Sequence, residues 1–157
     1  MKRHRNRGVM RRLRDARGNA MVEAAIITPL LLFLTFAIVD FAAGFYAYLA
    51  LENGVSQALR FGITGNLSGD LNHEESIKKA MRDATPFLTI EDGDFTFSHM
   101  TPGDADWEPG TGEPNDISKV TVNYEWTMMT PLVRELFPTG AFNIRVESAM
   151  KNEPRFE

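Results

Sequence analysis

The feature that most constrains this chain is a long apolar run near its N-terminus. In the 28 residues from Ala24 to Leu51, Asp40 is the only residue with a formal charge. An α-helix rises about 1.5 Å per residue and the hydrocarbon core of a bilayer is about 30 Å thick, so about 20 residues suffice to cross it. The run is apolar on all faces, and it exceeds the apolar core of a secretory signal, about 7–15 residues. It predicts a membrane-spanning helix rather than a buried helix of a soluble protein.

The charges on the two sides of this run differ in sign. Residues 1–18 hold eight Lys and Arg and one acid, for a net charge of +7, whereas residues 19–157 hold nine basic and twenty acidic residues, for −11. Basic residues favour the cytoplasmic side of a membrane. We therefore expect a single-pass protein with a basic cytoplasmic leader at residues 1–18, a transmembrane helix at 19–47 and an exported domain at 48–157. The chain has no cysteine, which excludes disulfides, thiol nucleophiles and cysteine metal sites.

Helical spacing of apolar residues continues beyond the apolar run. It predicts one helix over about residues 20–61, which changes from lipid-facing to amphipathic near Tyr46 and Tyr48 and ends at Gly62, Gly65 and Asn66. A second helix is expected after Asn72, a plausible N-cap, and Pro86 should terminate it.

Alternation of apolar and polar residues then predicts three half-buried strands. These strands are centred on residues 95–98, 120–127 and 142–147. A solvated loop rich in Pro, Gly and acids separates the first two, and a short helix with Thr130 as N-cap and Pro131 at its first position separates the last two. The expected fold is α+β, a long N-terminal helix packed on a small antiparallel sheet with a second short helix.

The junction between the leader and the apolar run has a distinctive pattern. The leader ends in Gly18, Asn19 follows, and Glu23 lies just before the run. A pattern of glycine followed five residues later by glutamate is weak by itself, but its position between a basic tail and a spanning run makes it more specific.

This opening resembles that of type IV prepilins, which carry a basic leader ending in glycine and a glutamate at the fifth mature position. More narrowly, "GNAMVEAAIITPLLLFLTFAIVDF", "LENGVSQALRFGITG" and the terminal "SAMKNEP" are similar to the TadE-like family of minor pilins of the Tad (Flp) system. The resemblance covers the helix almost continuously and the last strand more loosely. Asn19 departs from the aromatic first residue of better-known pilins.

The resemblance implies a pseudopilin of the bacterial inner membrane that serves the assembly of tight-adherence pili and is not an enzyme. A prepilin peptidase would cleave between Gly18 and Asn19. Partners would be other pilins and pseudopilins, Tad inner-membrane assembly proteins and membrane lipid, and the protein could also enter the surface pilus. No cofactor, metal or specific nucleic acid is implied.

Glu23 then has a physical role. Cleavage would create a cation, the amine of Asn19, and buried charges are tolerated chiefly when they are paired. Glu23 would pair with this amine in its own chain or in a neighbour and set the axial register of the assembly. The alternative is an interfacial glutamate that stays in headgroup water.

Two other residues of the apolar run stand out. Asp40 lies about 24 Å along a helix from Ala24, where it is either a hydrated residue at the outer interface or a polar contact to a partner helix. Pro29 removes a helix hydrogen bond and is a candidate site of helix flexibility.

Other chemistry has little support in the sequence. His4, His73 and His99 do not have a metal-ligand spacing, and the acidic residues between 92 and 116 form no contiguous calcium-binding loop. No catalytic arrangement is recognisable. Two classes of function remain, a minor pilin acting in assembly and a monomeric membrane-anchored periplasmic domain that binds a ligand or catalyses a reaction. Cleavage of the leader distinguishes them.

Overall fold

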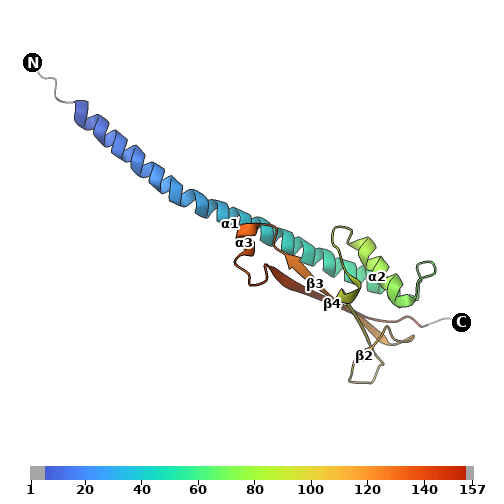
Figure 1. Cartoon of the computed structure of the whole chain (residues 1–157). Coiled ribbons are helices and arrows are strands. Elements are labelled where there is room, and N and C mark those ends of the chain that lie inside the picture. Colours follow the sequence, from blue (N-terminus) through green and yellow to red (C-terminus); the bar gives the residue numbers. More distant parts are fainter. Residues whose placement is uncertain (1–5, 155–157) are drawn as a thin grey trace, which may run out of the picture.

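The computed structural model describes the backbone of residues 6–154 and the side chains of residues 18–154. It shows one very long helix with a small α+β domain packed along its C-terminal part (Figure 1). This confirms the fold class predicted from the sequence. His4 and the basic side chains of the predicted leader lie outside the described side chains.

The long helix α1 spans Asn6–Ile63 and is gently curved and continuous through Pro29 (Figure 1). It begins earlier than the predicted start near residue 20, because the leader continues the same helix. Its end agrees with the prediction, since Gly65 has a φ of +69° and donates its N–H to the carbonyl of Gly62 at 2.9 Å. The next free carbonyl, of Ile63, accepts the N–H of Glu153 at 3.0 Å, which ties the helix end to the C-terminal segment.

Only the C-terminal part of α1 is covered by the domain. Buried positions recur every three or four residues along it, and they are Asp40, Gly44, Ala47, Leu51, Gly54, Val55, Ala58, Leu59 and Gly62. The part of α1 that packs against the domain therefore begins at Asp40, and the expected boundary between membrane helix and exported domain at residue 48 stays a prediction.

The second helix, α2, spans His73–Ala84 and packs on this covered part of α1. Its N-cap is Asn72, as predicted, and the side-chain Oδ1 of Asn72 accepts the N–H of Glu75 at 2.8 Å. Ile77 and Met81 bury almost completely against α1, each contributing about 1.5–3 kcal/mol. A 3-10 turn, η1 (Asp92–Asp94), follows and leads into the sheet.

The sheet is antiparallel with the order β2-β1-β3-β4. Its strands are β1 (Phe95–Met100), β2 (Glu108–Pro109), β3 (Ile117–Thr127) and β4 (Ala141–Lys151). The three predicted strands are present, and the two-residue β2 lies in the segment expected to be a loop. Val122 pairs with Val146, and both pack under α1 with Val120 and Ile144 to form the core. The short helix α3 (Pro131–Arg134) lies in the connection between β3 and β4.

Candidate functional site

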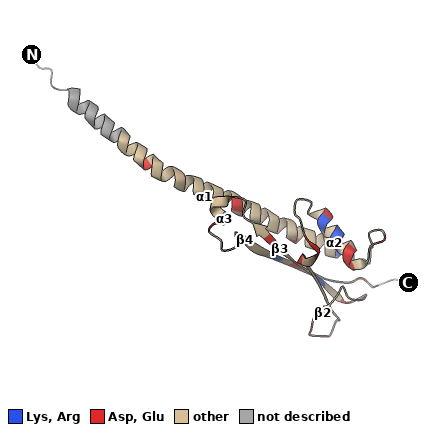
Figure 2. Cartoon of the chain, in the orientation of Figure 1, with Lys and Arg blue, Asp and Glu red and all other residues tan. Residues whose placement is uncertain are grey.

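The residues of the predicted cleavage junction lie within α1, well away from the domain. Gly18, Asn19 and Glu23 are exposed, and a Cβ added to Gly18 would meet no atom within 4 Å. Among residues 18–154 no basic side chain lies within salt-bridge distance of Glu23. Figure 2 shows this one acidic position in an otherwise uncharged stretch of helix.

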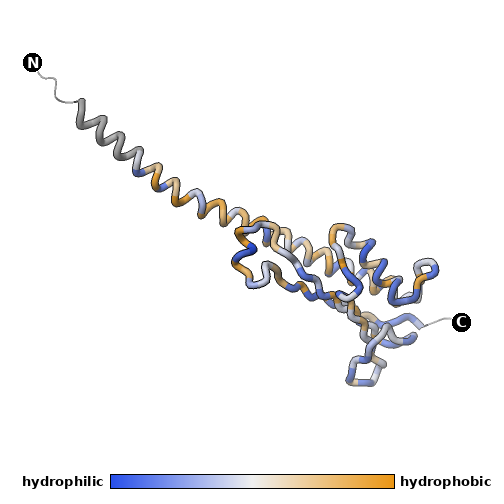
Figure 3. Tube along the Cα trace, viewed as in Figure 1, coloured by the Kyte–Doolittle hydropathy of each residue, from blue (hydrophilic) through white to orange (hydrophobic). Residues whose placement is uncertain are grey.

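The segment from Gly18 to Val39 is the part of α1 that the domain leaves uncovered. Its apolar side chains are open to the surroundings, for example Ile26 (69% exposed) and Leu30 (67% exposed). The part of α1 from Gly18 onward is long and apolar enough to cross a membrane, and none of its most apolar window is buried in the chain. These 22 residues extend about 33 Å, close to the thickness of a bilayer core. Figure 3 shows the predominantly hydrophobic colour of this stretch.

Asp40 is the first residue of α1 that the domain buries, and its side chain is fully buried. Its Oδ1 accepts the backbone N–H of Met129 at 3.0 Å, and its Oδ2 accepts that of Thr130 at 3.1 Å. The carboxylate thus satisfies the two backbone N–H groups that lead into α3. This is an arrangement within the chain that neither sequence interpretation considered, and contact of Asp40 with a partner helix stays a prediction.

Because Asp40 accepts the N–H groups before α3, the start of this helix is capped by Asp40 and not by the Thr130 side chain. Thr130 is the N-cap residue and Pro131 the first helical residue, as predicted, but the Thr130 side chain makes no capping hydrogen bond. The loop is held from its other side by Arg134, whose Nε and Nη2 donate to the carbonyl oxygen of Met128 at 3.2 and 2.8 Å. Met128 and Val133 are 1% exposed, so they anchor the loop in the domain.

Close packing follows one helical turn beyond Asp40. A Cβ added to Gly44 would lie 3.1 Å from Cζ of Phe142 and 3.3 Å from Nε1 of Trp126. Gly44 thus allows α1 to approach the sheet where β3 ends and β4 begins. Phe41, Phe45 and Phe142 line a shallow groove of about 400 Å³ beside this contact.

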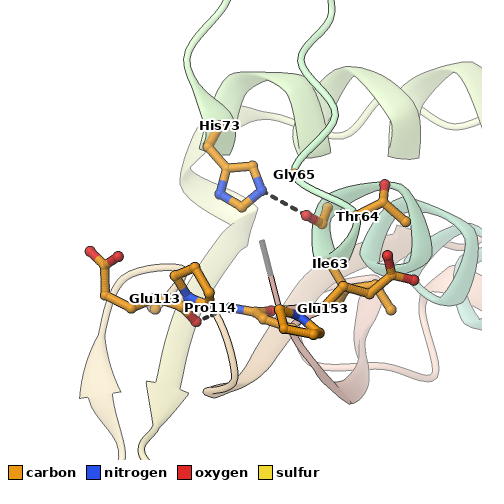
Figure 4. A pocket seen from close by; sticks show the side chains of 11 residues that line it. Ile63, Thr64, Gly65, His73, Glu113, Pro114 and Glu153 are labelled. Atoms are coloured by element: carbon orange, nitrogen blue, oxygen red, sulfur yellow. Dashed lines mark hydrogen bonds between the residues drawn. The ribbon is translucent and has the colours of Figure 1, made fainter. Parts of the chain in front are cut away.

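A second hollow lies at the opposite end of the domain, where α1 ends (Figure 4). It has a volume of about 370 Å³ and is lined by Ile63, His73, Glu113 and Glu153 among others. Both ring nitrogens of His73 are engaged, Nε2 with the carbonyl of Gly62 at 2.9 Å and Nδ1 with the hydroxyl of Thr111 at 3.1 Å. His73 therefore closes the fold at the end of α1.

Several acidic residues of the domain stabilise local structure. Oδ2 of Asp94 accepts the N–H of Glu91, and Oδ2 of Asp116 accepts the N–H of Glu113, both at 2.8 Å. The side-chain hydrogen bond from Arg82 lowers the pKa of Asp92. In the part of the chain that the structure describes, no group of three or more potential metal ligands is found.

Sequence reasoning missed the pairing of Asp40 with the start of α3. The signals were an acid in an apolar run and a Thr-Pro helix start that needs an acceptor, but 90 residues separate Asp40 from Thr130.

Tyr48, expected at the interface, is partly exposed. Its hydroxyl donates to Oε1 of Glu52 at 3.1 Å, and this hydrogen bond raises the pKa of Tyr48.

Comparison with known proteins supports the family resemblance. The family model described as TadE-like protein matches residues 18–60, which is almost the whole of α1 from Gly18 onward. Neither the curated proteins nor the solved structures gave a significant match to the chain. The match covers 43 of the 157 residues, and the apolar helix within it is long enough for a single-pass membrane protein. The N-terminal helix of this chain, over residues 18–60, is therefore TadE-like.

Proposed function

We propose that this chain is a minor pilin, or pseudopilin, that acts in the assembly of Tad-type tight-adherence pili. The observation that carries the proposal is the TadE-like match over residues 18–60. This match begins at Gly18, the glycine of the predicted cleavage junction, and includes the apolar part of α1 that the domain does not contact. The domain would lie on the periplasmic side of the inner membrane, held by α1, and other pilins and inner-membrane assembly proteins would be its partners.

Processing by a prepilin peptidase would cut the peptide bond between Gly18 and Asn19. This bond lies inside α1, and a peptidase needs an accessible backbone. Glycine is about 1 kcal/mol less favourable than alanine in a helix interior, so Gly18 is a point where the helix opens more easily. Gly18 is exposed and a Cβ added to it would meet no atom within 4 Å, which also leaves room for the enzyme.

Glu23 would act after cleavage. The new amine of Asn19 lies about 6 Å along the helix from Glu23, at a terminus where free N–H groups and the helix dipole favour a nearby negative charge. The Glu23 side chain is exposed, so it can meet the amine of its own chain or that of a neighbouring subunit. In an assembled bundle this pair would set the axial register of the helices.

The experiment is the intact mass and N-terminal sequence of the protein extracted from membranes of piliated cells. We expect a chain of 139 residues that starts at Asn19. A chain that still begins at Met1 in such cells would contradict processing and favour the alternative, a monomeric membrane-anchored periplasmic domain.

Topology has its own test. A reporter that is active only in the periplasm, fused after Glu157, should be active. Protease added to spheroplasts should degrade residues 52–157, and their survival with loss of the leader would show the opposite orientation.

A further inference from the structure

The loop between β3 and β4 presents an apolar surface beside the uncovered part of α1. Three large apolar side chains in and beside α3, those of Met129, Leu132 and Leu136, are 65%, 54% and 64% exposed. Met128 and Val133 from the same loop point the other way and are buried in the domain. The loop is thus amphipathic, with one side in the core and an apolar side facing outward.

The position of this loop along α1 is set by Asp40. Hydrogen bonds from the N–H groups of Met129 and Thr130 to the Asp40 carboxylate hold the start of α3 at that level of the helix. Asp40 lies about 33 Å along the helix from Gly18, roughly one bilayer core. Figure 1 shows α3 at the end of the domain nearest the N-terminal half of α1. The apolar side of the loop is therefore continuous with the surface of the apolar span.

We propose that the loop from Met128 to Thr139 is a membrane-contact element, in which Met129, Leu132 and Leu136 enter the outer interface of the bilayer that α1 spans. The proposal rests on the membrane anchoring in the proposed function. The loop would be a second point of contact with lipid, which restricts tilting of the domain about α1 at the membrane surface.

Two polar features of the loop suit this position, and the exposed carboxylate of Glu135 would have to stay in the headgroup water. The N–H groups before α3 are already satisfied by Asp40, so approach to lipid does not leave them without partners. The guanidinium of Arg134 is held at the Met128 carbonyl, and a basic group is favourable near lipid phosphates. Phe41 and Phe45, both 63% exposed, lie just beyond Asp40 on α1, and aromatic residues are common at this depth.

The absence of cysteine from the chain makes a direct test simple. Single variants Leu132→Cys and Leu136→Cys in the full chain are labelled with an environment-sensitive fluorophore and reconstituted into vesicles of phosphatidylethanolamine and phosphatidylglycerol. Some vesicles contain a lipid with a quencher near the headgroup end of its acyl chain. Leu34→Cys, in the apolar span, is the positive control, and Leu67→Cys, an exposed position (58%) beyond the end of α1, is the matched negative control.

We expect labels at residues 132 and 136 to emit at shorter wavelength than the label at residue 67 and to be quenched by the lipid at least about twice as strongly, because apolar groups at the interface sit among the upper acyl chains. If residue 34 is quenched while 132 and 136 behave like 67, the loop does not contact the membrane, although the anchoring stands. If residue 34 is not quenched, the anchoring itself fails. A third outcome would be that the labels at 132 and 136 are not quenched by the lipid but become shielded from water as the ratio of protein to lipid in the vesicles rises. This outcome would show that a second copy covers the surface, which also overturns the proposal.

Discussion

The Oδ2 atom of Asp40 accepts the backbone N–H of Thr130 at 3.1 Å, a hydrogen bond between residues 90 positions apart in the chain. Asp40 is fully buried although it lies in an apolar helix segment. A buried carboxylate is costly unless hydrogen bonds stabilise it, and here the N–H groups before α3 supply them. The contact joins the long helix to the far end of the sheet at the boundary between the uncovered and the covered parts of α1.

Replacing Asp40 should therefore release the α3 loop. We expect Asp40→Ala to lower the free energy of unfolding of the domain by about 2–3 kcal/mol, because two partly buried N–H groups lose their charged acceptor. Asp40→Asn, which keeps one acceptor oxygen, should cost less. Thermal unfolding and limited proteolysis within residues 128–139 measure the effect.

The matched control for this prediction is Asp70→Ala, at an exposed position, which should change stability by less than about 0.5 kcal/mol. Equal stability of Asp40→Ala and Asp70→Ala would show that the Asp40 carboxylate does not hold the loop.

The contact between α1 and α2 makes a second prediction. A Cβ at Gly54 would lie 2.6 Å from Cγ2 of Thr85 and 2.8 Å from Sδ of Met81, so these side chains or α2 itself would have to shift. Overpacking costs about 1–3 kcal/mol and higher helix propensity returns about 1 kcal/mol, so we expect Gly54→Ala to destabilise the domain by up to about 2 kcal/mol. Chemical unfolding followed by circular dichroism measures this change.

Gly93→Ala provides the comparison for Gly54, since a Cβ at Gly93 would meet no atom within 4 Å. It should leave the unfolding midpoint nearly unchanged. An increase in stability for Gly54→Ala would mean that Met81 and Thr85 accommodate the methyl group without cost.

Glu23 gives a prediction about assembly. We expect Glu23→Ala and Glu23→Gln to insert and to be cleaved almost normally, since the basic leader and Gly18 are unchanged, but to impair piliation. Loss of one member of a poorly hydrated pair costs about 3–5 kcal/mol when the other charge stays buried. Glu23→Asp should be intermediate, because it keeps the charge with a shorter reach.

The measurement is the number of pili and surface adherence at equal expression, with processing checked by gel mobility. Normal piliation of Glu23→Ala would return Glu23 to the role of a hydrated interfacial residue.

The ion pair of Arg82 with Asp92 predicts a pH dependence. Its hydrogen bond lowers the pKa of Asp92 below the ordinary 3.8 in the folded state, so its contribution to stability is present above about pH 4 and is lost as pH falls through the lowered value. Asp92→Asn should therefore lower the melting temperature slightly at neutral pH, and the difference from the unmodified protein should vanish near pH 2. Asp104→Asn, in the exposed loop, should show no such trend, and a difference for Asp92→Asn that persists unchanged at pH 2 would refute this explanation.

Local patterns in the sequence predicted most of the elements, because those patterns act over a few residues. The Asn72 cap, the end of α1 at glycine and the alternation in β4 were confirmed, whereas in β3 Thr121 is buried between Val120 and Val122 although it was expected on the polar side. The two residues of β2 were not predicted, because a strand this short has no period and forms only where β1 lies beside it. The N-terminal extension of α1 to Asn6 was also not predicted, because the apolar pattern that indicates a helix begins only near residue 20.

The sequence by itself also determined the length of the apolar helix, the separation of charge across it and the TadE-like opening with Gly18 and Glu23. Only the tertiary structure decided where the domain begins on that helix, because this depends on which residues pack against α1 from distant parts of the chain. It also decided the role of Asp40. The free energy of a carboxylate in an apolar run depends on the partner it finds, and that partner, the backbone before α3, comes beside it only when the connection between β3 and β4 folds back onto the helix.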